Sequence, residues 1–577
     1  MQRSVSHGKT VKSAFLVILM IIMTQVGYLD LINSPRTGND SFDEESSVME
    51  TGGSGSSNTL TPSVEGADLT IGEMMDDITF QYDASAAGTY NGNGTSWMVK
   101  DINTGSSSLS SNFVGQDAVM GDEMYFFATD GVHGFELWKS DGTEAGTVMV
   151  KDIVSGSGSS MPWGGGVKAQ IAALNNTVYF VVNDGIHGEE LWKSDGTEAG
   201  TVMVKDINPT NVNSGNSDIR TLTPMGDTMY FRADDGTHGS ELWKTDGTTS
   251  GTVMVKDIFS GSSPGVPESN RMTAVGNTLY FTANDGTHGH ELWKSDGTTS
   301  GTVMVKNINT HGLGATGSQI QPISVAGNYI YFEAQGTSGW SFWRSDGTDA
   351  GTISILDDSN RVLNSGNSAT IGNTLYFGKN YSNGEIWKTD GTVSGTMMVK
   401  NVLPQQTNNL RFLGANGNQA QSGGISCHNS VGNTFYFAVG TSISAPHYLW
   451  KSDGTASGTV QVKDANNANV EVGSSTCGII GDTQYFTSHN TGQLWKTNGT
   501  PSGTKMVIDM PSLSSGNGGL HYSFLPLNNK LYFAASDGVH GYELWALDPA
   551  DITGLGGGSS SGSGTSVTTT YGNGTTW

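Results

Sequence analysis

The sequence has few charged residues and only two cysteines, and both shortages exclude classes of protein. Of the 577 residues, 14% are charged, against about 25% in an ordinary globular domain. Together with 81 glycines, this composition excludes a helical bundle, a coiled coil and a multi-span membrane protein. Two cysteines exclude a disulfide-rich scaffold and a Cys-x-x-Cys zinc site. Aromatic residues recur evenly along most of the chain, which disfavours a wholly disordered protein.

Positive charge is also scarce, with 28 Lys and Arg against 54 Asp and Glu and a formal net charge of −26 at pH 7. Such a surface repels phosphate backbones, so we expect no nucleic-acid partner. Divalent cations are the only partners that this charge favours, and Ca²⁺ is the one cofactor candidate. The HExxH and P-loop motifs are absent, and no Ser-His-Asp set stands out from the repeats described below. We therefore expect a protein that is not an enzyme.

The N-terminus resembles an export signal. Three basic residues, Arg3, Lys9 and Lys12, precede an apolar run over residues 13–29, as in a secretory signal. This run is also at the lower length limit for a membrane-spanning helix. Residues 1–30 are thus predicted to be a signal peptide or a signal anchor, and the only membrane contact. The protein is expected to be secreted or anchored on the outer side of the cell membrane.

An acidic, low-complexity stretch follows over residues 31–88. Residues 37–99 contain eleven Asp and Glu and no Lys or Arg, a composition typical of a disordered spacer. Within it, residues 67–85 weakly resemble the first strands of an Ig-like module.

A motif of about 50 residues recurs along most of the remaining chain. One copy, YFTANDGTHGHELWKSDGTTSGTVMVKNI, starts at Tyr280. Nine tryptophans mark the copies: Trp138, Trp192, Trp243, Trp293, Trp343, Trp387, Trp450, Trp495 and Trp545. Successive tryptophans lie 44 to 63 positions apart. A period near 50 is typical of kelch-like propeller blades rather than of WD40 blades or helical repeats.

Each copy divides into four short segments rich in the residues that β-strands prefer. In the copy around Tyr280 they are MTAV, TLYFTA, HELWKS and TVMVKNI, termed strands A, B, C and D. The joints contain Gly-Asn or Gly-Asp, then Asp-Gly, then Ser-Asp-Gly-Thr, which suit the positive φ angles of tight hairpins. The sequence therefore predicts an all-β array of four-stranded antiparallel meanders.

A strand count predicts that the array closes into a ring. The ninth copy runs from Trp545 into Ala546–Pro549 and lacks a strand D, while a spare strand D stands at residues 94–102. If the two pair, no edge is left open. We predict a single closed β-propeller of about nine four-stranded blades over residues 89–552, with two smaller propellers or an open arc as alternatives. Residues 553–577 are a Gly/Ser linker and the start of a further array.

Strand C and the turn after it carry an eight-residue motif that is intact in four copies: Glu136–Thr143, Glu190–Thr197, Glu241–Thr248 and Glu291–Thr298. The motif resembles that of the ELWxxDGT-repeat (hyalin-like) family of bacterial and archaeal proteins, over about residues 95–548. The resemblance implies an extracytoplasmic, β-propeller-like array and no established activity. Later copies drift from the pattern, and Asn498 replaces the motif's Asp.

The connections between strands predict where a ligand binds. In a meander the A–B and C–D turns share one face, and the B–C loops and D-to-A connections share the other. The D-to-A connections vary most between copies: 155–166, 208–217, 309–319 and 403–424. Divergent loops on a rigid scaffold are typical of binding surfaces, although drift without selection also produces variation. We expect a binding, adhesion or scaffold module that presents this face to an extracellular protein or glycan.

The alternative function is a secreted hydrolase or lyase that acts on polysaccharide at the propeller's channel mouth. Non-repeated Asp, Glu, His or Tyr residues that converge there would favour it. Trp163 and Trp340, both in loops, are candidates for contact with a sugar.

The loop face also carries the motif Asp-Gly-x-His-Gly-x-Glu. Its polar residues are Asp130/His133/Glu136, Asp184/His187/Glu190, Asp235/His238/Glu241, Asp285/His288/Glu291 and Asp537/His540/Glu543. Asp, His and Glu are metal-ligand types, which makes these residues candidates for calcium or zinc. Their recurrence in every intact copy favours a structural role, in which the Asp accepts backbone N–H groups and the His braces the hairpin.

Two further sets of residues carry predictions about contacts. Cys427 and Cys477 precede strand B in adjacent copies, so they either form a disulfide or remain free buried thiols. Lys139, Lys151 and Asp152 fall on strands whose two faces both meet neighbouring blades, where partly buried Lys–Asp pairing is expected.

Overall fold

The computed structural model divides the chain into two units, residues 1–83 and 84–577. All the described residues belong to the second unit: 95–104, 113–161, 170–210, 212–268, 272–310, 317–318, 320, 324–337, 339–357, 368–379, 384–402, 409–412, 430–440, 446–473, 477–488, 493–509, 520–536, 540–549, 570–571 and 575–576. The predicted signal or anchor at 1–30 and the acidic spacer at 31–88 therefore lie outside them. In the described part, no helix has the length and apolarity that crossing a membrane requires.

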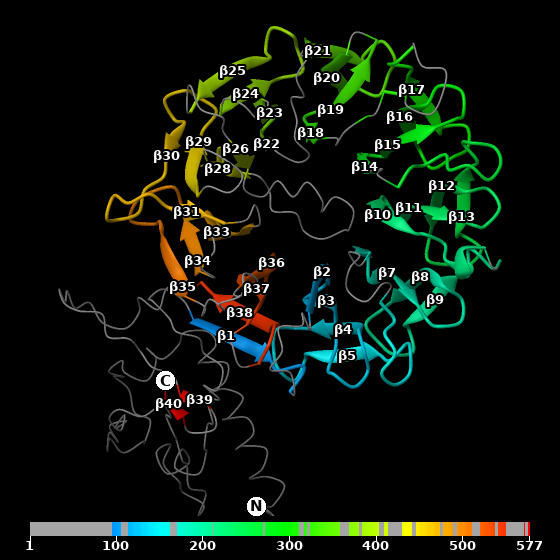
Figure 1. Ribbon diagram of the computed structural model, residues 1–577, viewed down its shortest axis with the longest axis horizontal. Helices are drawn as coiled ribbons and strands as arrows, with labels where there is room; N and C mark the ends of the chain where they lie inside the picture. The colour runs from blue at the N-terminus through cyan, green and yellow to red at the C-terminus, as the bar shows by residue number, and fades with distance from the viewer. Residues whose placement is uncertain are drawn as a thin grey trace, which may run out of the picture. The chain divides into compact units, whose positions relative to one another are not determined.

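Nine antiparallel sheets, the blades, follow one another along the chain, one for each tryptophan-marked copy (Figure 1). The strands of blades 1 and 2 are β2 (Phe113–Met120), β3 (Glu123–Ala128), β4 (Glu136–Ser140), β5 (Val148–Lys151), β6 (Ile171–Leu174), β7 (Thr177–Asn183), β8 (Glu189–Ser194) and β9 (Val202–Lys205). Those of blades 3 and 4 are β10 (Arg220–Met225), β11 (Thr228–Asp234), β12 (Ser240–Thr245), β13 (Val253–Lys256), β14 (Thr273–Val275), β15 (Thr278–Asn284), β16 (His290–Ser295) and β17 (Val303–Lys306).

Blades 5 and 6 continue the pattern with β18 (Ser324–Ala326), β19 (Tyr329–Gly336), β20 (Gly339–Ser345), β21 (Ile353–Asp357), β22 (Ser368–Ile371), β23 (Thr374–Lys379), β24 (Glu385–Thr389) and β25 (Met397–Asn401). Blade 8 contains β32 (Cys477–Ile480), β33 (Thr483–Thr487), β34 (Gln493–Thr497) and β35 (Lys505–Asp509). A 3₁₀ turn, η3 (Val212–Gly215), is the one helical element among the described residues. The predicted all-β propeller is confirmed.

Blade 7 departs from four strands because its first and last strands are each interrupted. Its elements are β26 (Asn409–Phe412), β27 (Ser430–Val431), β28 (Thr434–Gly440), β29 (His447–Ser452), β30 (Val460–Gln461) and β31 (Glu471–Val472). Both β26 and β27 pair with β28, and both β30 and β31 pair with β29. The interruptions add sequence at the two edges of the blade without changing its central pair.

Blade 9 closes the ring with a strand from the start of the propeller. It contains β36 (Leu520–Leu527), β37 (Lys530–Ala535), β38 (Glu543–Asp548) and β1 (Thr95–Lys100). Strand β1 pairs antiparallel with β38, with Trp97 opposite Ala546, and Figure 1 shows the blue β1 alongside the red β38. Strand β2 of blade 1 also contacts β36 of blade 9. The prediction of one closed ring is confirmed, and the two alternatives are excluded. The predicted Gly/Ser linker lies outside the described residues. Of the C-terminal stretch 553–577, the structure describes only the strand pair β39 (Thr570–Tyr571) and β40 (Thr575–Thr576).

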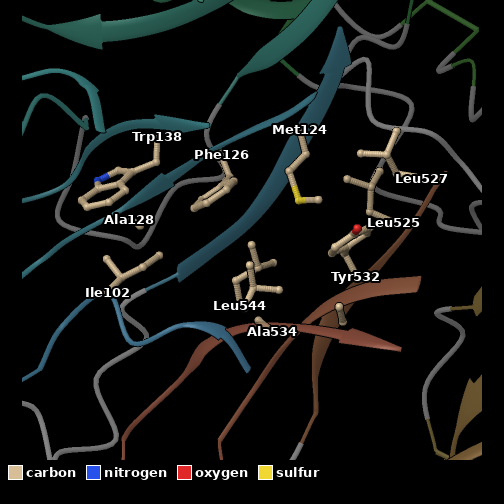
Figure 2. Packing of buried hydrophobic residues seen from close by; sticks show 12 residues of the cluster. Ile102, Met124, Phe126, Ala128, Trp138, Leu525, Leu527, Tyr532, Ala534 and Leu544 are labelled. Carbon is tan, nitrogen blue, oxygen red and sulfur yellow. The ribbon is translucent and has the colours of Figure 1, made fainter. Parts of the chain in front are cut away.

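The core lies between blades, because each sheet is covered on both faces by its neighbours. The B strands are accordingly buried almost throughout, and only the first residue of β3 is partly exposed. Figure 2 shows one inter-blade cluster, between blades 9 and 1, with Met124, Phe126, Trp138, Leu525 and Tyr532 among its members. The A strands lie toward the centre of the ring and the D strands at its rim (Figure 1).

Candidate binding face

The B–C turns and the D-to-A connections lie together, as the meander argument predicts. In the connection from blade 1 to blade 2, Ser160 donates its backbone N–H to the carbonyl of Phe135, at the end of the B–C turn (3.0 Å). The carbonyl of Ser160 accepts the N–H of Asn183, at the end of strand B in blade 2 (2.8 Å). Ser217 and Ser318 make the same two bonds in later connections. Each of these connections is therefore fixed at one point to both blades that it joins.

The motif glutamate anchors the start of each connection from inside the blade. Glu136 is fully buried, and its carboxylate accepts the N–H groups of Ile153 (3.1 Å), Val154 (3.3 Å) and Ser160 (3.2 Å). Burial raises the pKa of Glu136 to about 7, although the hydrogen bonds that it accepts lower it. Corresponding glutamates hold the next three connections: Glu190, Glu241 and Glu291. These buried carboxylates accept backbone N–H groups of the connections and are not exposed at the surface.

The motif Asp and His form a hydrogen-bonded pair in the B–C turn. In blade 1, Asp130 Oδ1 accepts the N–H groups of Val132 and His133 (both 2.9 Å), and Asp130 Oδ2 lies 2.7 Å from His133 Nδ1. The hydrogen bond to Asp130 raises the pKa of His133. Burial raises the pKa of Asp130, but the bonds from His133 and Val132 outweigh it and the net shift is downward. Three further pairs repeat this geometry: Asp184–His187, Asp235–His238 and Asp285–His288.

The structure thus separates the three polar residues of the motif, which were candidates for a shared metal site. The Asp and His close the turn, whereas the Glu faces the connection. In the part of the chain that the structure describes, no group of three or more His, Cys, Asp or Glu side chains could hold a metal ion. The arrangement of the described copies is therefore that of the structural role, in which the Asp accepts backbone N–H groups and the His braces the hairpin.

The ninth copy of the motif is described only in part. Asp537 lies outside the described residues, whereas His540 is described and partly buried, three residues before strand β38 begins. His540 was a candidate metal ligand, and it too belongs to no metal-binding group among the described side chains. Its pairing with Asp537 stays a prediction. Glu543 accepts the N–H groups of Ile102 (2.9 Å) and Asn103 (3.4 Å), so it anchors backbone as the other motif glutamates do.

The remaining predicted site residues are placed only in part. Trp340 was predicted to lie in a loop, but it lies in β20 of blade 5, paired opposite Gln335 of β19, and it is partly buried. Trp163 and Cys427 lie outside the described residues, and only the strand position of Cys477, in β32, is described. The disulfide and the sugar-contact aromatics therefore stay predictions.

The C–D turns on the opposite face are fixed by their own side chains. In blade 1, Ser140 Oγ lies 2.7 Å from Thr147 Oγ1 and accepts the N–H of Gly142 (3.0 Å). Asp141 Oδ1 accepts the N–H and the hydroxyl of Thr143 (2.8 and 2.7 Å). The hydroxyl pair and the Asp or Asn contact recur in the C–D turns of blades 2 to 8. These side chains build the turn, which leaves the opposite face as the variable one.

Lys139 and Lys151 do not pair with Asp152 as predicted, although Lys306, at the position of Lys151 in blade 4, lies 3.2 Å from Asp349 Oδ1. Lys151 of strand D donates to the backbone carbonyl of Thr201, in the C–D turn of blade 2 (2.9 Å), and Lys139 forms an ion pair with Glu123 (2.9 Å). Lys151 is the last residue of β5 and reaches the next blade, whereas Asp152 lies beyond the end of that strand. Lys151 therefore connects neighbouring blades, whereas the ion pair of Lys139 lies within blade 1.

One charged cluster lies outside the repeat motif and was not predicted. In the connection from blade 2 to blade 3, Asp218 Oδ1 lies 3.0 Å from Arg220 Nη2, and Asp218 Oδ2 lies 2.6 Å from Arg232 Nη1. Arg220 Nη1 is also 3.7 Å from Glu189 Oε2. The sequence does contain a sign of this cluster, which is a departure from the repeat. Arg232 follows the Tyr-Phe pair of strand B, at a position where the neighbouring copies have Val or Thr.

Comparison with known proteins adds no family. No family model matches the chain, and no curated protein matches it. It is similar to a GH74 enzyme of Niastella koreensis (13% identity over 80% of this chain and 79% of that one, TM-score 0.30). It is also similar to oligopeptidase B from Leishmania major (12%, 68% and 55%, TM-score 0.35) and to oligogalacturonate lyase from Vibrio parahaemolyticus (10%, 66% and 98%, TM-score 0.31). These low values carry no argument about activity.

Proposed function

We propose that this protein is an exported binding module that presents the D-to-A connections to an extracellular protein or glycan and catalyses no reaction. One observation carries the proposal: the connections from blade 1 to blade 5 differ in sequence, yet a buried motif glutamate and two backbone hydrogen bonds hold each of them. A single serine makes both bonds in three connections, and Gly265 and Val266 share them in the connection from blade 3 to blade 4. A scaffold that fixes the ends of loops and lets their middles differ is suited to recognition.

The resemblance to ELWxxDGT-repeat proteins supports the same proposal, since it implies a location outside the cytoplasm. The opposite face offers less variety, because its C–D turns repeat one side-chain network. The loop face therefore differs more in sequence from copy to copy than the opposite face does, and it is better suited to specific recognition of a ligand.

The test is to scramble the residues of two connections, 209–213 and 310–316, while the glutamates, residues 214–217 and Ser318 are kept. The exported protein is applied to glycan arrays and to immobilised extracellular matrix proteins. We expect the scrambled variants to lose capture with an unchanged melting temperature. The matched control is Glu198→Gln, an exposed change on the opposite face, which should leave capture intact.

Two outcomes would contradict the proposal. Capture that survives scrambling of both connections would remove the loop face as the binding surface. Turnover in a parallel polysaccharide hydrolysis screen would replace the binding module with the hydrolase or lyase alternative.

A further inference from the structure

The connection from blade 2 to blade 3 has an unusual backbone. Two of its residues that are not glycine have positive φ, Ser214 (61°) and Asp218 (45°), and so does Thr221 (60°) just inside β10, where the register with β11 shifts. In the rest of the described chain, the non-glycine residues with positive φ are all asparagines, which tolerate that region. A β-branched residue such as Thr221 does not, and such strained residues persist where the surroundings hold them for a function.

Buried and partly buried hydrogen bonds hold this backbone in place. The N–H of Thr221 donates to Gln170 Oε1 of the preceding blade (2.9 Å). Asn208 Nδ2 donates to the carbonyl of Asn216 across the connection (3.0 Å), and Asn216 Oδ1 accepts the N–H of Glu189 (2.9 Å). The described residues of this connection are therefore held in place before any ligand arrives, which lowers the entropy lost on binding.

The charged cluster of Glu189, Asp218, Arg220 and Arg232 (the blade 2–3 cluster) sits on this connection. Glu189 begins β8 directly after the B–C turn, and Arg220 begins β10 opposite Arg232 of β11. Arg232 Nε also donates to the carbonyl of Val266 in the next connection (2.9 Å). The cluster thus lies on the candidate binding face, between two connections.

Exposure divides the cluster into a contact pair and a supporting pair. The side chains of Asp218 and Arg220 are 33% and 16% exposed, whereas those of Glu189 and Arg232 are 4% and 7% exposed. Glu189 and Arg232 therefore orient the other two from behind, as a second layer of contacts does in a built site.

The charges of the cluster select a neutral ligand. Two guanidinium groups balance two carboxylates, so neither an anion nor a cation gains net attraction. Arg220 Nη1 donates to the carbonyl of Ile219 (2.8 Å) and Nη2 faces Asp218, and a guanidinium has five N–H groups, so further donors remain beside the Asp218 carboxylate. Neighbouring hydroxyl groups of a sugar can donate to the carboxylate and accept from these N–H groups. We propose that the blade 2–3 cluster binds vicinal hydroxyl groups of a neutral saccharide, an inference that rests on the proposed function and names its ligand class.

The test is isothermal titration calorimetry, which measures the affinity for linear hexasaccharides of glucose, mannose, galactose and xylose and for their uronate-containing counterparts. Arg220→Lys keeps the positive charge beside Glu189 but removes the planar guanidinium with its several N–H donors. We expect a neutral hexasaccharide to bind the wild type and to bind this variant at least tenfold more weakly. Asp218→Asn, which removes the charge with little change of shape, is the second variant and should have the same effect. Glu268→Gln, an exposed change in the next connection, is the control and should bind as the wild type does.

The outcomes separate this inference from the proposed function. If scrambling 310–316 abolishes capture of a protein ligand while no hexasaccharide binds, the binding module stands and the saccharide site is wrong. Tighter binding of uronates than of neutral sugars, or unchanged affinity in both cluster variants with their melting temperatures retained, would also overturn the inference.

Discussion

The carboxylate of Glu543 accepts the backbone N–H of Ile102, which lies 441 positions earlier in the chain, at 2.9 Å. In blade 1 the equivalent Glu136 accepts the N–H of Ile153, only 17 positions away. The contact within a repeat and the contact that closes the ring are thus the same interaction. Because the two contacts are equivalent, residues 95–102 take the place of the strand D that the last copy lacks.

Removal of this contact should loosen the closing strand. Glu543→Ala leaves the N–H groups of Ile102 and Asn103 without their acceptor, at a cost of about 1–3 kcal/mol in unfolding free energy. Hydrogen exchange measured by mass spectrometry should show faster exchange in β1. The control, Glu291→Ala, removes the equivalent contact in blade 4 and should leave β1 protected. Equal protection of β1 in both variants would mean that Glu543 does not hold it.

A glycine in the C–D turn of blade 1 tests the packing between blades 1 and 9. Gly142 has φ +88°, and a Cβ there would overlap the hydroxyl of Tyr532 in blade 9. Gly142→Ala therefore adds steric overlap to backbone strain of about 1–3 kcal/mol. The control is Gly121→Ala, where φ is +62° but a Cβ would meet nothing within 4 Å. In urea denaturation the first variant should lose more stability, and equal losses would show that Tyr532 adds no constraint.

The Asp–His pairs predict a histidine titration. The hydrogen bond to Asp184 raises the pKa of His187 above its ordinary 6.5. In Asp184→Asn that pKa should move back toward 6.5, while the pKa of His238, paired with Asp235 in the next blade, stays raised. Proton NMR of the imidazole Cε1–H resonances measures both. An unchanged His187 midpoint in the variant would contradict the pairing.

The buried glutamates predict that stability falls as pH rises. Burial raises the pKa of Glu190 and Glu241 in the folded protein to about 7 from an ordinary 4.5. A raised folded pKa contributes stability that is present below pH 4.5 and lost as pH rises through 7. The melting temperature should therefore fall between pH 4.5 and 7, and Glu241→Gln should make the fall less steep. A steeper fall in the variant would show that the ionised form is the stabilising one. Asp246→Asn, an exposed turn position, serves as the control.

Several features of the fold were predictable because they depend on neighbouring residues. Asp-Gly pairs and the Tyr-Phe and Leu-Trp segments placed the hairpins, and the count of strands predicted that 94–102 pairs with Glu543–Asp548. The partners of the lysines were predicted wrongly. Lys151 reaches Thr201, 50 positions away, and such a partner is chosen by how two blades pack rather than by local spacing.

By itself, the sequence determined the number of blades, the order of their strands and which connections share a face, because turn chemistry and strand alternation act over a few residues. Only the tertiary structure decided that the motif glutamate is buried and accepts the N–H groups of the following connection, and that Asp218, Arg220, Arg232 and Glu189 gather in one cluster. Those contacts join residues of different strands or of neighbouring blades. Their geometry depends on how these elements pack against one another, which cannot be read from the sequence of a single repeat.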